Sequence, residues 1–207
     1  MTVEELVAFV ATKTQRLDKD STILAGINWA KDDLCASKHK LLFKRSDITL
    51  VPGQVKYTQG GDGLPSDFNM IDDILYVYSS TLKYSLPNIP YQAIEENTIN
   101  RGFPTGYDIQ GTNDLYVGDP PAGTAHTIQV YYYHRPGDYS DDSTTPVFVS
   151  EYGNDAYIYG AEFYLWQSVE EYQRAQYAQQ LYHKERGQIF SQGQSKGTPV
   201  TRPQQLF

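Results

Sequence analysis

The side chains that most often carry out catalysis or bind metals are scattered along this chain. The histidines fall in different predicted elements and form no His-x-x-x-His pair: His39, His126, His134 and His183. The chain has no Gly-x-Ser-x-Gly elbow, and its glycine-rich stretch 60–63 is not followed by the lysine-bearing helix start of a phosphate-binding loop. We therefore expect structural histidines, no metal site and no cofactor, and we expect that the protein is not an enzyme.

Acidic residues gather in two places that might suggest calcium binding or paired-carboxylate catalysis. The first group lies in a polar stretch after Pro136: Asp138, Asp141 and Asp142. Its spacing lacks the glycine and the distal glutamate of a calcium loop, so we interpret the stretch as a solvated linker. The second group lies on a predicted helix, where its members are expected to be solubilising charges: Glu162, Glu170 and Glu171.

Composition limits the classes of partner. The formal net charge of the 207 residues is -8, which argues against a protein that grips DNA, because that task requires clustered Lys and Arg. The single cysteine, Cys35, excludes an intrachain disulfide and lies in a helical pattern, where a small buried side chain is expected. The N-terminus has no signal-peptide pattern and no run is long enough to span a bilayer, so we expect a protein made in a cytosol, with no membrane partner.

Two helices are predicted before the first strand. Thr2 and Glu5 form a capping-box pattern just before the apolar residues Leu6, Phe9 and Val10, and the first helix is expected to end near Leu17. Helical spacing resumes afterwards and continues to Phe43, through these apolar positions: Ile23, Ile27, Ala30, Leu34 and Leu41.

Beyond Ile48 the apolar period changes from helical to two, which indicates strands. Six runs separated by Pro, Gly and Asp turns are predicted: 48–51, 55–57, 71–78, 107–110, 114–117 and 128–134. The chain also holds 18 tyrosines, whose apolar ring and polar tip suit half-buried strands and polar interfaces.

A proline-free stretch over 150–187 predicts one long helix, about 50 Å from end to end. Its apolar stripe is longer than a small domain needs to cover, so we expect it to contact other copies of the chain in a ring. The expected ring contacts are Tyr164, Tyr172 and Tyr182.

The predicted fold is α+β, a bundle of two N-terminal helices and the long C-terminal helix, with an inserted antiparallel β domain and an extended C-terminal arm. The expected parts are a bundle half at 1–45, the β domain at 46–136, a linker at 137–149, the bundle helix at 150–187 and the arm at 188–207. The arm is rich in Gly, Pro, Gln and Ser yet ends in Leu206 and Phe207, so we expect it to be extended until it docks on a partner.

Five short motifs in order resemble the β insertion of tailed-phage head-to-tail adaptors. They are Val51-Pro52-Gly53-Gln54-Val55-Lys56-Tyr57, Leu64-Pro65-Ser66-Asp67-Phe68, Gly106-Tyr107-Asp108-Ile109, Leu115-Tyr116-Val117 with Pro120-Pro121, and Tyr131-Tyr132-Tyr133. Tyr159-Gly160-Ala161 is similar to the start of the C-terminal bundle helix of these adaptors, a plan shared with the tubular adaptor of short-tailed phages.

The resemblance implies a structural virion protein at the head-tail junction, assembled in the host cytoplasm as a dodecameric ring under the portal. The ring would hold the tail or nozzle protein and pass the genome during ejection, with no specific DNA binding. Its C-terminal arm would dock on the portal protein, and the candidate contacts there are Lys196, Pro199, Arg202, Pro203, Leu206 and Phe207.

Two other classes of protein compete with this interpretation. A β-sandwich carbohydrate-binding or tail-fibre (baseplate) module would use exposed tyrosines as stacking platforms, but it explains neither the long helix nor the arm. A hydrolase would need a site that no motif reveals.

Overall fold

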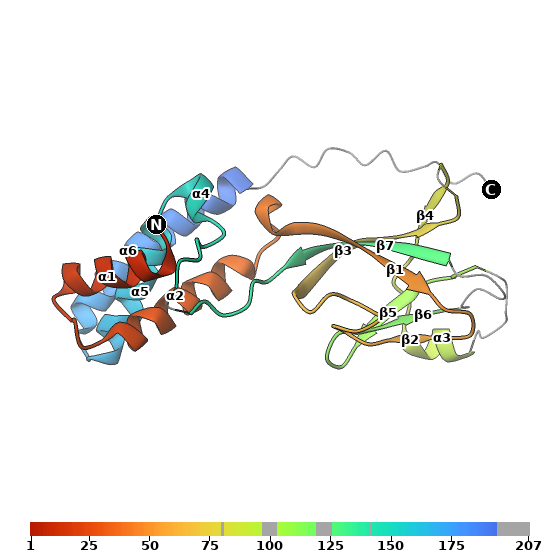
Figure 1. The fold of residues 1–207 in the computed structure, drawn as a ribbon, viewed down its shortest axis with the longest axis horizontal. Helices are drawn as coiled ribbons and strands as arrows, with labels where there is room; N and C mark the ends of the chain where they lie inside the picture. Colours follow the sequence, from red (N-terminus) through yellow and green to blue (C-terminus); the bar gives the residue numbers. More distant parts are fainter. Residues whose placement is uncertain (80, 97–102, 119–125, 141, 194–207) are drawn as a thin grey trace. The chain divides into compact units, whose positions relative to one another are not determined.

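The computed structural model describes residues 1–79, 81–96, 103–118, 126–140 and 142–193. The chain forms two compact units (Figure 1). Residues 1–41 and the described residues from 136 onward make up the helical unit, and residues 42–135 make up the β unit. The fold is therefore α+β, with antiparallel sheets inserted between helices, as the sequence predicts.

Helix α1 (Val3–Thr14) begins with the predicted capping box. The Thr2 hydroxyl accepts a hydrogen bond from the Glu5 N–H at 3.2 Å, and the Glu5 carboxylate accepts one from the Thr2 N–H at 2.9 Å. The helix ends before the expected Leu17 because Gln15 adopts a left-handed conformation, with φ of 56°.

Helix α2 (Asp20–Cys35) is shorter than predicted, since helical spacing in the sequence continues to Phe43. Local hydrogen bonds end it: the Ser37 hydroxyl donates to the Leu34 carbonyl, and the Leu41 N–H donates to His39 Nδ1. A 3-10 helix, η1 (Lys40–Leu42), follows, and Phe43 already belongs to a strand.

The prediction of one continuous helix over 150–187 is wrong. The stretch forms α4 (Val149–Tyr152), α5 (Asp155–Ser168) and α6 (Tyr172–Gly193). Gly153, with φ of 78°, separates the first two. Between α5 and α6, Glu170 has φ of 62°, and the Glu171 N–H donates to the Trp166 carbonyl at 2.9 Å in a Schellman turn.

The Schellman turn folds α6 back onto α5. Ala175 and Ala178 pack in one cluster with Trp166, and the Tyr182 ring lies beside Gly160. The stretch predicted as one long helix thus contains a helical hairpin of α5 and α6. Its second helix also continues past the expected end at 187 to Gly193, so the first residues of the predicted arm are helical.

The larger sheet of the β unit has the strand order β1-β7-β3-β4, with every pair antiparallel. Its strands are β1 (Phe43–Leu50), β3 (Phe68–Val77), β4 (Lys83–Ser85) and β7 (His126–His134). Strand β7 is central, and its register places Ile48 opposite Ile128 and Phe43 opposite Tyr133. Strand β4 was not predicted, because three residues of Lys, Tyr and Ser carry no apolar period.

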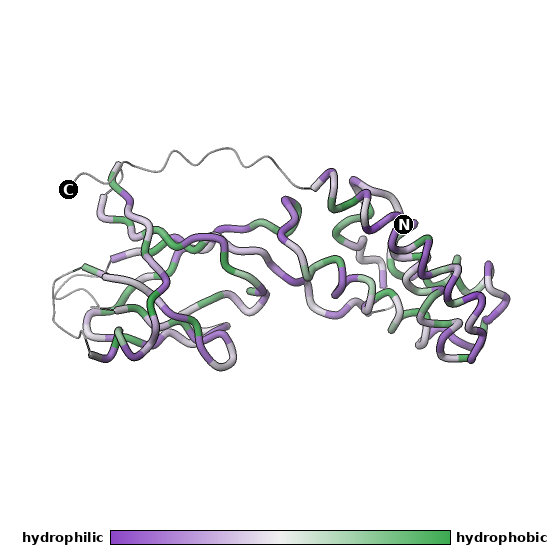
Figure 2. The backbone as a smooth tube through the Cα atoms, turned by 180° about the vertical axis from the view of Figure 1, so that it is seen from behind, coloured by the Kyte–Doolittle hydropathy of each residue, from purple (hydrophilic) through white to green (hydrophobic). Residues whose placement is uncertain are grey.

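The smaller sheet has the order β2-β6-β5, and a short helix lies near it. The elements are β2 (Lys56–Tyr57), α3 (Tyr91–Glu96), β5 (Tyr107–Gln110) and β6 (Asp114–Val117). One apolar core joins the two sheets, with side chains such as Ile128 and Val130 from the larger sheet and Leu115 and Val117 from the smaller. Figure 2 shows that hydropathy changes from residue to residue along these strands, whereas α6 is mostly hydrophilic.

Candidate functional site

Tyr182, one of the three predicted ring contacts, belongs to the core of the helical unit. Its side chain is fully buried and its ring packs against Trp29 at 5.1 Å between centroids. The Tyr182 hydroxyl donates to Asp33 at 2.6 Å, and Arg186 lies 2.6 Å from the same carboxylate. Burial, followed by this hydrogen bond to Asp33, raises the pKa of Tyr182. A residue so enclosed has no surface to offer a neighbour, so this part of the ring prediction is corrected.

Tyr164 and Tyr172 are exposed on the helical unit, with 36% and 62% of their surface accessible. The Tyr164 Cβ lies close to Gly26, where α5 packs on α2, while part of the Tyr164 surface remains accessible. Tyr172 is the first residue of α6, directly after the Schellman turn. Large exposed apolar side chains of this kind are candidates for contacts between proteins.

Three further exposed apolar residues on the helical unit were missed by the sequence analysis. Phe9 is one of the apolar residues of the predicted first helix but is 45% exposed, while Leu17 and Tyr177 are 74% and 66% exposed. At about 100° per residue, the helical period places Phe9 nearly opposite the buried residues Val7 and Ala11, which is consistent with its exposure.

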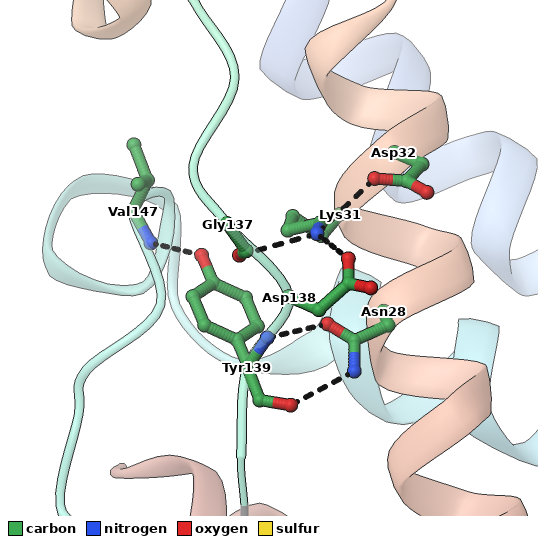
Figure 3. A network of polar contacts seen from close by, with 7 residues as sticks. All are labelled: Asn28, Lys31, Asp32, Gly137, Asp138, Tyr139 and Val147. Atoms are coloured by element: carbon green, nitrogen blue, oxygen red, sulfur yellow. Dashed lines mark hydrogen bonds and ion pairs between the residues drawn. The ribbon is translucent and has the colours of Figure 1, made fainter. Parts of the chain in front are cut away.

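The described residues of the polar stretch after Pro136 are mostly exposed, in keeping with the prediction of a solvated linker, but the stretch is also hydrogen-bonded to the helical unit. Figure 3 shows Asp138 and Tyr139 tied to helix α2. The Asn28 side chain pairs with the Tyr139 backbone through two hydrogen bonds of 2.7 and 3.0 Å, and buried Lys31 lies 2.6 Å from Asp138. The Tyr139 hydroxyl accepts a hydrogen bond from the Val147 N–H at 3.2 Å.

The N-terminus of α1 also forms hydrogen bonds with the same stretch. The Val3 and Glu4 N–H groups, which have no partner within the helix, donate to the carbonyls of Thr144 and Asp142. We call the described residues of this stretch, 137–140 and 142–147, the stapled segment. Composition alone could not reveal it, because its partners are more than a hundred residues away in the sequence.

His39 is the buried histidine of the helical unit, with 1% of its surface exposed. Its Nδ1 accepts from the Leu41 N–H, and its Nε2 lies 3.1 Å from the Tyr152 hydroxyl. Gly193, the last residue of α6, packs so closely on the imidazole ring that an added Cβ would lie 1.8 Å from it. Burial lowers the pKa of His39, so the neutral ring joins the ends of α2, α4 and α6 in a structural role.

The other histidines also lie in local contacts rather than in one site. His126 is hydrogen-bonded to the Tyr76 hydroxyl at 2.8 Å, His134 lies 3.7 Å from Asp67, and the His183 ring contacts that of Tyr182. Among the described residues no group of His, Cys, Asp and Glu side chains could hold a metal ion. In the same part of the chain, no helix combines the length and the apolar character needed to cross a bilayer.

The predicted portal contacts, from Lys196 to Phe207, lie outside the described residues. The described part of the chain ends just before them at Gly193, the last residue of α6, which packs against His39.

A family model described as SU10 adaptor protein matches residues 1–204, almost the whole chain. The chain belongs to the SU10 adaptor protein family. No curated protein matches it.

Family membership makes the protein a head-to-tail adaptor of a bacteriophage, as the sequence resemblance implies. Such an adaptor is a structural component of the virion and works through contacts with the portal and tail components, and its family is not one of enzymes.

Proposed function

We propose that the adaptor forms a dodecameric ring under the portal, docks there by its C-terminal arm, holds the tail or nozzle protein and passes the genome during ejection. The observation that carries the proposal is the family match over residues 1–204. The exposed Tyr164 and Tyr172 support lateral contacts between helical units, because each side chain leaves part of its surface accessible to a neighbour.

The arm is proposed to be the anchor. Residues 194–207 follow α6 directly and include two basic side chains, Lys196 and Arg202, for acidic partners. Leu206 and Phe207 would each gain roughly 1.5 to 3 kcal/mol on burial in a groove, which offsets part of the entropy lost when an arm is fixed. Repetition of the arm around a ring then raises the effective concentration of every contact.

The genome is proposed to pass without being held. The net charge of -8 disfavours phosphate contacts, so DNA would slide along the ring rather than bind to it.

A binding experiment with the portal protein tests the arm. Full-length adaptor is expected to co-sediment with portal rings and to appear as an added ring in electron micrographs. Deletion of residues 194–207 should abolish co-sedimentation and leave the circular dichroism spectrum and melting temperature of the free protein unchanged, because the described cores end at Gly193.

Normal docking of the truncated protein would show that the arm is not the anchor. The matched control is the substitution of Lys196 and Arg202 by Gln in the full-length chain, which should weaken docking only in part, since the apolar end is retained.

A further inference from the structure

A hollow of about 390 Å³ lies where the end of α1 meets the hairpin of α5 and α6. We call it the tip pocket, and its lining residues are Lys13, Thr14, Gln15, Glu162, Trp166 and Arg174. The left-handed residues Gln15 and Glu170 end α1 and α5 close to these residues in sequence. The tip pocket thus combines side chains from the end of α1 with side chains from α5 and α6, which lie about 150 residues later in the sequence.

Arg174 is the positive charge of the tip pocket that has no carboxylate among the described residues. Its guanidinium lies 4.8 Å from the centre of the Trp166 ring. Trp166 is itself held by Ala175 and Ala178 and is 8% exposed, so it forms a firm platform under the arginine. When a guanidinium stacks on an aromatic ring, the N–H groups at the periphery of the guanidinium remain available to donate hydrogen bonds.

The other charges of the tip pocket already neutralise each other. Lys13 Nζ lies 2.6 Å from Glu162 and 5.1 Å from the centre of the Tyr159 ring. The Glu162 side chain is 10% exposed, so its charge is fixed beside that of Lys13. The remaining net charge is that of Arg174, and the pocket is therefore suited to an anion.

We infer that the tip pocket receives a carboxylate side chain from a neighbouring copy of the adaptor. This inference rests on the proposed ring and identifies one contact between its subunits. A carboxylate matches the planar fork of Arg174 and can accept two parallel hydrogen bonds. Lys13 lines the same pocket, so the bound carboxylate would lie among two cations and Glu162.

Charge complementarity identifies the neighbouring copy as the occupant. The chain carries a net charge of -8, and its helical unit exposes carboxylates that have no cationic partner in the described structure: Asp20, Asp155 and Glu171. Leu17 and Tyr172, which are exposed and adjoin the lining segments in sequence, add apolar contact area at the same end of the helical unit. A local cation favours association of two acidic proteins, because it offsets part of the repulsion between their overall charges.

The DNA phosphate backbone is a poorer match for this pocket. Retention of a duplex requires many cations along a surface, whereas the tip pocket has one uncompensated charge and a buried glutamate beside it.

A titration of the free protein tests the chemistry of the pocket. An acetylated, amidated tetraglutamate peptide is expected to shift the indole N–H signal of Trp166 in a nitrogen-proton NMR spectrum, with Trp29 as the internal reference. Tetraglutamine should have no effect. Arg174→Gln should weaken the binding about tenfold or more, because a hydrogen bond to a charged group is lost. Arg16→Gln removes an equal charge outside the pocket and should bind tetraglutamate like the wild type.

Assembly then tests the occupant. The protein concentration needed for ring formation is expected to rise about tenfold in Arg174→Gln and to stay unchanged in Arg16→Gln. If the wild type forms rings and Arg174→Gln forms them equally well, the inference is overturned while the proposed function stands. If the wild type forms no rings with or without portal, the proposed function fails. A Trp166 shift caused equally by a DNA duplex, or the lack of a shift with tetraglutamate, would also overturn the inference.

Discussion

The two units of the adaptor are stabilised by different means. In the β unit the strands satisfy one another's backbone groups, and alternate apolar side chains fill the space between the sheets. The β unit also buries two polar side chains, Gln129 and His134, but both belong to strand β7. In the helical unit, by contrast, buried or nearly buried polar groups connect one helix to another or a helix to a segment without regular structure: Lys31, His39, Glu162 and Tyr182. The described residues of the stapled segment have no strand partner and no helical hydrogen bonds. The comparison shows that such a segment is fixed in place when residues distant in the sequence supply hydrogen bonds to its backbone.

The comparison also separates two kinds of tolerance to substitution. The β unit should depend mainly on apolar volume, and the helical unit on specific polar partners as well as volume. Both tryptophans, Trp29 and Trp166, are in the helical unit, so intrinsic tryptophan fluorescence reports on that unit selectively.

The largest expected effect sharpens this contrast at Tyr182. Tyr182→Ala should lower the free energy of unfolding by about 3 to 5 kcal/mol, because it opens a cavity against Trp29 and leaves Asp33 without its hydroxyl partner. Tyr182→Phe keeps the ring and should lose about 1.5 to 3 kcal/mol, the range for a hydrogen bond to a charged group. Urea unfolding followed by tryptophan fluorescence measures both. An unchanged urea midpoint for Tyr182→Ala would contradict its place in the core and favour the original prediction that Tyr182 contacts another subunit of the ring.

An intermediate effect is expected where helices cross closely. An added Cβ at Gly160 would lie 2.6 Å from the Ala30 Cβ, so Gly160→Ala should cost about 1 to 3 kcal/mol through overpacking of α5 against α2. Gly187 on α6 is the matched control, since nothing lies within 4 Å of its added Cβ. Gly187→Ala should stabilise the protein by about 0.5 to 1 kcal/mol through helix propensity. Thermal unfolding of both variants measures the difference. A change in melting temperature of the same sign in both variants would contradict the close packing of α5 on α2.

The smallest expected effect is a pH dependence confined to the helical unit. Burial lowers the folded pKa of His39 below the ordinary value of 6.5, so folding favours the neutral ring. The stability that this provides is complete above the unfolded pKa and is lost as the pH falls below about 6.5 towards the folded pKa. The charged or titratable neighbours of His39 are Lys40, Glu151 and Tyr152.

Urea midpoints read by tryptophan fluorescence between pH 7.5 and 5 should therefore decrease for the wild type. The decrease should be smaller in His39→Gln, which has no imidazole to protonate. An equal decrease in both proteins would assign the pH dependence to other groups.

Local signals in the sequence predicted most of the architecture. Strands β5 and β6 lie where their alternating residues place them, and the Thr2 and Glu5 capping box starts α1. The turn at Glu170 was missed because a left-handed glutamate has no signature of the kind that a glycine provides. Burial of Tyr182 was misjudged because a stripe read along one straight helix does not show that α6 folds back.

Long-range pairing accounts for the remaining differences in the candidate site. The contacts of Asn28 and Lys31 with the stapled segment connect residues more than a hundred positions apart, and no local pattern encodes them. The tip pocket was likewise invisible in the sequence, since Lys13 meets Glu162 only after the helices have packed. The arm, in contrast, was predicted from composition alone and remains a proposal.

The insertion of the β unit between two halves of the helical unit has a consequence for how the chain emerges from the ribosome. The β unit closes with β7, so its strands can pair while the last helices are still being made. Helix α2, which ends at Cys35, packs on α5, which begins at Asp155, about 120 residues later. At roughly 5 to 20 residues per second, the apolar sides of α1 and α2 wait on the order of ten seconds for their partner. The first helices to be synthesised thus belong to the last unit to be completed, and during that interval they are the part of a nascent adaptor that a chaperone would shield.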